Sequence, residues 1–159
     1  MEYKRLADTN VFLPAVGMGT WEYKGGVETL RKGIAEGGTL IDTAEAYGTE
    51  EIVGKAIHGL REQVFLATKV LPRYFRRSDL LRAADNRLRR LHTDRIDLSQ
   101  RHWPNYIVPI EETMGAMEEL AVNGKVRFIG VSNFSAAELH QAQKFLFRHW
   151  IVSNQVLGH

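Results

Sequence analysis

The stretch Leu40 to Gly48 carries an acid, Asp42, and five residues later a tyrosine, Tyr47, directly after a short apolar run. If that run is a β-strand, both side chains lie just past its C-terminal end, where α/β folds place their chemistry. A phenol with a pKa of about 10 is a reluctant proton donor at neutral pH, but a neighbouring ammonium makes it more acidic. Lys69, near the end of a later apolar run, could supply that ammonium. These residue types indicate proton transfer to a reacting group.

Further polar residues stand at or just after the ends of three later apolar runs. They are His102, Ser132, Asn133 and Gln155. Taken singly, each candidate named so far has an ordinary structural reading: a loop cap, a half-buried aromatic, a lysine that reaches solvent, a core histidine or a buried amide. Their recurrence at matching places on successive runs favours one assembled site.

The elements that must position these residues alternate between strand-like and helix-like patterns. A hairpin is predicted from 3–6 and 11–13. The predicted strands then span 15–21, 39–43, 64–70, 96–102, 126–131 and 151–156, and the predicted helices span 27–36, 49–58, 110–122 and two segments that begin near Ser78 and Ser135. Such alternation predicts parallel strands with right-handed crossovers, in either a doubly wound sheet or a (β/α) barrel. Polar residues at the ends of five strands favour the barrel, because a doubly wound sheet would gather them at one switch point.

Three of the predicted helices begin with a candidate N-cap. Thr49 and Ser78 each precede or open a helical pattern, and Ser135 with Glu138 forms the spacing of a capping box. These residues predict where the helices start.

Composition excludes several classes of partner. Lys and Arg number 21 against 19 Asp and Glu, so a net charge of +2 argues against nucleic acid or a membrane surface as a partner. The basic clusters 73–77 and 87–95 are predicted to be solvated outer faces. Cysteine is absent, which removes disulfides and thiolate chemistry. No apolar run approaches membrane-spanning length and no signal peptide is evident, so we expect a cytoplasmic protein.

Three common site motifs are also missing from the sequence. Gly17 and Gly19 begin a dinucleotide fingerprint, but Glu22 occupies the place of its third glycine. Ser132 lies in Gly-Val-Ser-Asn-Phe, which lacks the second glycine of a nucleophile elbow. The six histidines show no paired ligand spacing, so no metal site is predicted.

Five motifs, in order along almost the whole chain, resemble those of the aldo-keto reductases. They are Gly-Thr-Trp at 19–21, Ile-Asp-Thr-Ala-Glu-Ala-Tyr-Gly at 41–48, Ala-Thr-Lys-Val at 67–70, Gln-Arg-His-Trp-Pro at 100–104, and Gly-Val-Ser-Asn-Phe at 130–134 with Asn-Gln-Val at 154–156. The resemblance implies a (β/α)8 TIM-barrel fold and an NAD(P)H-dependent oxidoreductase that reduces an aldehyde or ketone to an alcohol. It further implies NADPH (NADP) as the cofactor and a small-molecule carbonyl compound as the substrate.

The same resemblance implies roles for individual residues. Tyr47 would be the general acid, Lys69 would make its phenol more acidic, Asp42 would hold Lys69, and His102 would orient the carbonyl oxygen. Ser132, Asn133 and Gln155 would hold the nicotinamide carboxamide, and Thr20 and Trp21 would line the cofactor pocket.

The chain also departs from the family pattern. A complete barrel of this type has eight strand-helix units and about 250 residues, so we expect residues 1–159 to be a single aldo-keto reductase-like domain that lacks the seventh and eighth units. Since those units supply much of the family's grip on the cofactor phosphates, an alternative is a non-catalytic truncated remnant, or a regulatory or binding module that cannot hold cofactor alone. The two exposed edges of a six-stranded sheet predict a homo-oligomer or a complementing chain.

Overall fold

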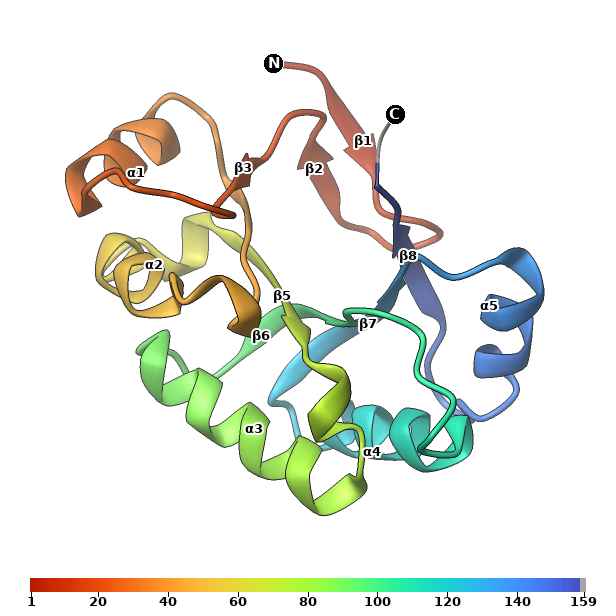
Figure 1. Cartoon of the computed structure of the whole chain (residues 1–159). Coiled ribbons are helices and arrows are strands. Elements are labelled where there is room, and N and C mark those ends of the chain that lie inside the picture. The colour runs from red at the N-terminus through yellow and green to blue at the C-terminus, as the bar shows by residue number, and fades with distance from the viewer. Residues whose placement is uncertain (158–159) are drawn as a thin grey trace.

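A six-stranded parallel sheet curls through the molecule, with its strands side by side in chain order from β3 to β8 (Figure 1). The computed structural model describes residues 1–157. The strands are β3 (Met18–Gly19), β4 (Leu40–Asp42), β5 (Phe65–Val70), β6 (Ile96–Arg101), β7 (Val126–Ser132) and β8 (Ile151–Gln155). A doubly wound sheet would reverse its strand order at a switch point. The uninterrupted order confirms the prediction of an incomplete barrel.

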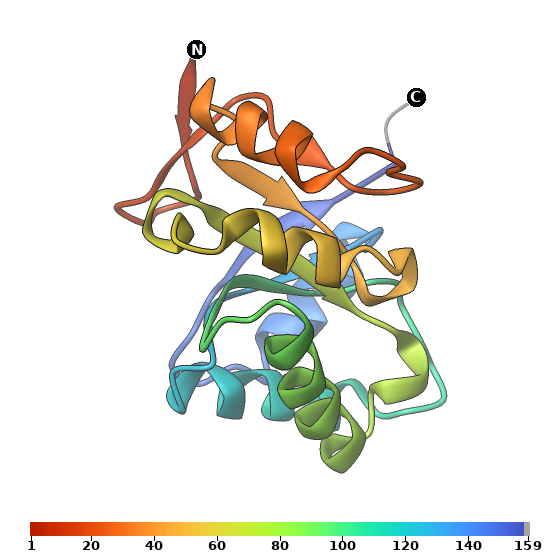
Figure 2. The same cartoon turned by 90° about the vertical axis from the view of Figure 1, so that its left-hand side faces the viewer.

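Five helices follow the strands and cover the outer face of the sheet; α1, α2 and α3 form one layer in Figure 2. They are α1 (Val27–Ala35), α2 (Glu50–Ile57), α3 (Arg77–Arg90), α4 (Ile110–Val122) and α5 (Ala136–Gln143), with short 3-10 turns η1 (Glu45–Tyr47), η2 (Arg61–Gln63) and η3 (Pro72–Tyr74). Their apolar residues recur at helical spacing, as Leu30 and Ile34 do in α1, and are buried against the sheet. The main core therefore lies between the helices and the sheet.

An antiparallel hairpin, β1 (Tyr3–Arg5) and β2 (Phe12–Pro14), precedes the sheet as predicted. Its Leu6 and Leu13 pack against a small apolar cluster on the inner face, which includes Phe65 at the start of β5 and Leu98 in β6. The hairpin thus covers the inner face near the starts of the strands. The opposite, carboxyl ends are left for a site.

Two of the three predicted N-cap residues do not cap their helices in the structure. Ser135 forms the expected capping box with Glu138. Thr49 occupies the N-cap position of α2, but its side chain does not cap the helix. Ser78 lies inside α3, which begins at Arg77; the backbone N–H of Arg77 donates to a Glu112 carboxylate oxygen at 3.0 Å. At the start of α3 the hydrogen-bond acceptor is thus a carboxylate from α4 and not the Ser78 hydroxyl. The prediction that Ser78 caps this helix was wrong.

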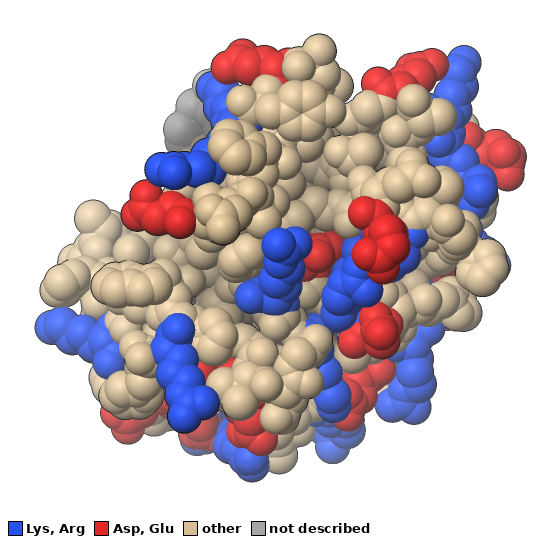
Figure 3. All heavy atoms as spheres, turned by 180° about the vertical axis from the view of Figure 1, so that it is seen from behind, with Lys and Arg blue, Asp and Glu red and all other residues tan. Residues whose placement is uncertain are grey.

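Charged side chains of both signs are interspersed on the face of the molecule in Figure 3, without a large patch of one sign. The basic cluster 87–95 was predicted to be solvated, but its first residue, Arg87, is only 1% exposed. Within residues 1–157 we find no helix that is both long and apolar enough to cross a membrane.

The two edge strands of the sheet generate a prediction about association. Within the described residues, β3 pairs only with β4, and β8 only with β7, so each presents an unpaired edge. Exposed edges are templates for pairing with another chain. We expect the purified 159-residue chain to form oligomers or aggregates that grow with concentration in multi-angle light scattering. A monodisperse monomer that unfolds cooperatively would contradict this expectation.

Candidate active site

A cavity of about 550 Å³ opens at the carboxyl ends of the strands. Its lining contains seven of the nine residues predicted from the sequence to form the site, together with Trp103, Val156 and Leu157. The seven are Trp21, Tyr47, Lys69, His102, Ser132, Asn133 and Gln155. Parallel strands place their carboxyl ends at one edge of the sheet, which is why residues so far apart in the sequence meet here.

Lys69 is the single charged residue of the buried strand β5 and is itself only 2% exposed. Its ammonium donates to Asp42 Oδ1 at 2.6 Å and to the Thr43 carbonyl oxygen at 3.3 Å. Burial lowers the pKa of Lys69 below its usual value, and the neighbouring Asp42 carboxylate opposes that effect. The two side chains form a close ion pair between β4 and β5.

Tyr47 ends the 3-10 turn η1, and Gly48 beyond it adopts a left-handed conformation (φ 68°) that allows α2 to start at once. The Lys69 ammonium lies 5.3 Å from the centroid of the Tyr47 ring. The pKa of Tyr47 is nevertheless raised, first by burial and second by the negative charge of Asp42. Burial and the Asp42 carboxylate therefore shift the pKa of Tyr47 in the direction opposite to the acidification expected from Lys69.

His102 lies between two aromatic rings at the same end of the sheet. Its imidazole meets the Tyr47 ring edge to face at a centroid distance of 5.9 Å and stacks on Trp103 at 3.8 Å. Burial, and then the positive charge of Lys69, lower the pKa of His102 to about 4. Nδ1 is buried without a hydrogen-bond partner among the described residues. The ring is therefore neutral at pH 7.

Ser132, Asn133 and Gln155 lie together at the ends of β7 and β8. The Ser132 hydroxyl and the Asn133 backbone N–H both donate to the Gln155 carbonyl oxygen, at 2.7 Å and 3.0 Å. The Gln155 side-chain amide donates to Asp42 Oδ2 at 3.0 Å and accepts from the Gln100 amide at 3.0 Å. Gln155 thereby connects the last strand to the ion pair of Lys69 and Asp42.

The two residues of the first motif lie in different surroundings. Trp21 is 70% exposed and lines the cavity. Thr20 is fully buried, and its hydroxyl donates to the Asp42 carbonyl oxygen at 3.2 Å and accepts from Thr49 at 2.9 Å. Thr20 therefore supports the strand that carries Asp42, rather than lining the cavity. The same contact explains why Thr49 does not cap its helix.

A buried ion network behind the cavity could not be recognised in the sequence. Arg87 Nε lies 3.2 Å from a Glu50 oxygen, and its Nη2 lies 3.6 Å from a Glu45 oxygen and 3.4 Å from the Lys69 carbonyl oxygen. Glu45 belongs to the turn that carries Tyr47, so Arg87 joins that turn to the strand that carries Lys69. Glu45 and Glu50 flank Tyr47 and could have signalled such a network, but Arg87 stands in a run of arginines typical of a solvated face.

This network yields a prediction of stability. Replacing Arg87 with Met would remove the buried cation beside Glu50, which is 2% exposed and would keep as a cation only the partly exposed Arg90, at 2.7 Å. Breaking a buried ion pair costs up to about 3–5 kcal/mol. We expect Arg87→Met to lower the free energy of unfolding by an amount of that order in urea denaturation. The matched control is Arg89→Met on an exposed part of the same helix, which should change it by less than about 0.5 kcal/mol. Equal costs for the two variants would rule out a structural role for the network.

The environment of His102 yields a prediction of pH dependence. Its folded-state pKa of about 4 lies below the usual value of 6.5, so between these pH values the unfolded chain binds a proton that the folded chain does not. Stability from neutral His102 is present above pH 6.5 and is lost as the pH falls toward 4. We therefore expect the stability advantage of the wild type over His102→Gln to shrink across this window. An NMR titration of the His102 ring with a midpoint near 6.5 would refute the assignment.

The sequence of this chain is similar to those of known reductases. The family model described as "Aldo/keto reductase family" matches residues 15–157. The aldo-keto reductase YhdN of Bacillus subtilis (strain 168) is 46% identical over 162 residues, which cover 87% of this chain and 49% of the relative. The methylglyoxal reductase YeaE of Escherichia coli (strain K12) is 44% identical over 160 residues, covering 94% and 56%. The chain thus spans about half the length of these curated relatives.

Solved structures show the same relationship. The thermostable aldo-keto reductase Tm1743, crystallised with the inhibitor epalrestat, superposes with a TM-score of 0.95 at 44% identity, covering 99% of this chain and 63% of that one. An aldo/keto reductase from Klebsiella pneumoniae in complex with NADP and acetate gives a TM-score of 0.83 at 44% identity, covering 93% and 56%. Sequence and fold agree, and this chain belongs to the aldo-keto reductase family.

Proposed function

We propose that the cavity at the carboxyl ends of the strands reduces an aldehyde or ketone to an alcohol, with Tyr47 as the proton donor. The observation that carries the proposal is the convergence of Tyr47, Lys69 and neutral His102 on one cavity, with Asp42 paired to the Lys69 ammonium. Relatives named methylglyoxal reductases, and the reductase crystallised with NADP, support the reaction class.

NADPH is the proposed cofactor, and the donor set at one side of the cavity fits its nicotinamide end. A carboxamide has an acceptor oxygen and a donor nitrogen, and Ser132, Asn133 and Gln155 offer a hydroxyl and two amides that can complement both. When bound, the cofactor supplies the hydride. The Gln155 amide already contacts Asp42 and Gln100, so binding would require it to exchange one of these partners. We assign no residue of this chain to the adenosine phosphates.

Tyr47 would donate its proton to the oxygen of the substrate carbonyl. Its raised pKa keeps the phenol protonated at neutral pH, and a developing alkoxide is a far stronger base than a phenolate. Lys69, 5.3 Å from the ring centroid, would stabilise the phenolate that remains. Asp42 holds the ammonium in place, which makes it a positioning residue in this scheme.

His102 would orient the substrate. A neutral imidazole carries one N–H, and with Nδ1 buried and unpartnered, Nε2 is the nitrogen that would donate to the carbonyl oxygen. A donor held rigidly by stacking on Trp103 needs little reorganisation as charge develops on that oxygen. Trp21 and Trp103, both exposed at the cavity, would provide apolar walls for a small carbonyl compound.

The alternative is a binding or regulatory module that keeps the site but does not turn over substrate. Two observations favour it: the Gln155 amide is already occupied by protein partners, and the described sheet stays open between β3 and β8. A chain of this kind would bind NADPH weakly or only with a complementing partner.

Carbonyl-dependent oxidation of NADPH by the purified chain distinguishes the two functions. Across a panel of small aldehydes and ketones, including methylglyoxal, we expect turnover that falls about 100- to 10,000-fold in Tyr47→Phe, the range lost with a general acid. Tyr3→Phe on the exposed hairpin is the matched control and should retain full activity.

Equal activity in Tyr47→Phe and the wild type would refute the assignment of Tyr47. No activity together with no NADPH binding, measured by fluorescence of the nucleotide, would favour the binding module instead.

A further inference from the structure

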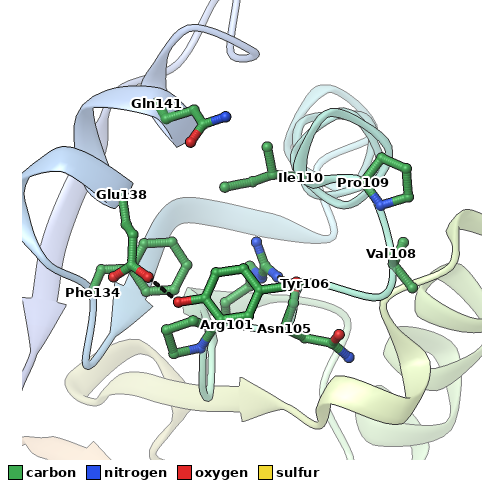
Figure 4. Close-up of a pocket in the computed structure, with 10 residues that line it drawn as sticks. Arg101, Asn105, Tyr106, Val108, Pro109, Ile110, Phe134, Glu138 and Gln141 are labelled. Carbon is green, nitrogen blue, oxygen red and sulfur yellow. Dashed lines mark hydrogen bonds between the residues drawn. The ribbon is translucent and has the colours of Figure 1, made fainter.

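A second cavity, of about 180 Å³, lies on the other side of β6 from the candidate active site. Consecutive side chains of a strand point to opposite faces, so Gln100 contacts Gln155 on the inner face, whereas Arg101 faces the helices. The lining comes from the loop after β6, the start of α4 and the first turns of α5 (Figure 4). Nothing in the proposed reaction uses this cavity.

Arg101 is a buried cation with few partners. It is 1% exposed, and its guanidinium packs against the Phe75 and Phe134 rings at 4.2 Å and 5.3 Å from their centroids. Among residues 1–157 its one hydrogen bond runs from Nη2 to the Asn105 carbonyl oxygen at 3.2 Å, and Nε is buried without an acceptor. No carboxylate of the described chain lies within ion-pair distance. Burial accordingly lowers the pKa of Arg101 to about 10.

The acid that shares this cavity with Arg101 is occupied elsewhere. Glu138 accepts from the Ser135 backbone N–H in the capping box and from the Tyr106 hydroxyl. In Figure 4 the Tyr106 ring lies in front of Arg101, with which it lines the cavity, and its hydroxyl is directed at Glu138. Since Tyr106 is 84% exposed and belongs to a loop, it is a cover that a ligand could displace. The geometry therefore leaves an unpaired guanidinium beneath a movable aromatic ring.

We propose that this cavity is a binding site for a small monocarboxylate. The carboxylate would pair with the planar fork of Arg101, the geometry that guanidinium groups bind best. The apolar body would contact Phe134, Val108 and Ile110, which form the walls. A cavity of about 150 Å³ is known to hold benzene in another protein, so an acid with one ring or a short chain fits. Glu138 at the rim disfavours ligands of higher negative charge.

The Trp103 indole lies close enough to this cavity to report ligand binding there. The loop that carries Tyr106 also carries Trp103, whose indole stacks on His102 at 3.8 Å. Displacing Tyr106 would move this loop, so the Trp103 indole signal should respond to the ligand without any turnover. Binding here is therefore measurable whether or not the chain reduces carbonyls.

Benzoate is the probe that we would titrate into the full chain, followed by two-dimensional NMR of backbone amides and tryptophan indoles. We expect saturable shifts at Phe134, Ile110 and Trp103. Benzyl alcohol, which has the ring without the charge, should bind about tenfold more weakly or worse. Arg101→Met should cause a similar loss, and it should fold because it removes an uncompensated buried charge. Arg82→Met, on an exposed part of α3, is the matched control and should bind like the wild type.

A second variant keeps the test decisive if Arg101→Met fails to fold. Ile110→Trp fills the cavity from the partly exposed start of α4 while leaving Arg101 in place, and it should abolish benzoate binding with little change in thermal unfolding. Undiminished binding to either variant would overturn the proposal. So would shifts confined to Trp21, Tyr47 and Gln155 at the candidate active site, or no saturable binding at millimolar benzoate.

Discussion

The ion pair of Lys69 and Asp42 is the interaction around which the carboxyl end of the sheet is organised. An ammonium that is 2% exposed would be costly to bury alone, and Asp42 at 2.6 Å offsets that cost. Both the side chain and the backbone of Asp42 accept further hydrogen bonds. The Gln155 amide donates to its second carboxylate oxygen, and the Thr20 hydroxyl donates to its backbone carbonyl oxygen. Contacts from β5, from β8 and from the residue that follows β3 thus meet at Asp42 on β4.

The electrostatic effect of this pair differs from that of an isolated lysine. The pKa of the Tyr47 phenol rises, first because the phenol is partly buried and second because the Asp42 carboxylate lies nearby. His102 keeps its neutral form for a related reason, since burial and the remaining positive charge both oppose its protonation. In the proposed reaction a protonated phenol and a neutral imidazole are the forms needed to donate hydrogen bonds to a carbonyl oxygen.

Arg87 and Arg101 show two outcomes for a guanidinium buried between the sheet and its helices. Arg87 has two carboxylates close by, and they belong to the turn and helix that follow β4. It therefore stabilises the backbone on which Tyr47 sits. Arg101 has aromatic rings and one carbonyl oxygen around it, so within residues 1–157 its charge has no counterion. Because their partners differ, we assign a structural role to Arg87 and propose a ligand-binding role for Arg101.

Much of this protein follows from the sequence by itself. Apolar runs, helical periodicity and the capping box of Ser135 are local patterns, and they determined the order of the elements and the incomplete barrel. The five motifs indicated the family, and they predicted that Tyr47, Lys69 and His102 meet at one end of the sheet. Other features were decided only by the tertiary structure, because they depend on partners distant in the chain. Glu112, and not Ser78, accepts a hydrogen bond from the backbone at the start of α3, and Glu45 and Glu50 form ion pairs with the buried Arg87. The charge state of a side chain and the end of a helix depend on the groups that surround them, and a sequence does not show which groups those are.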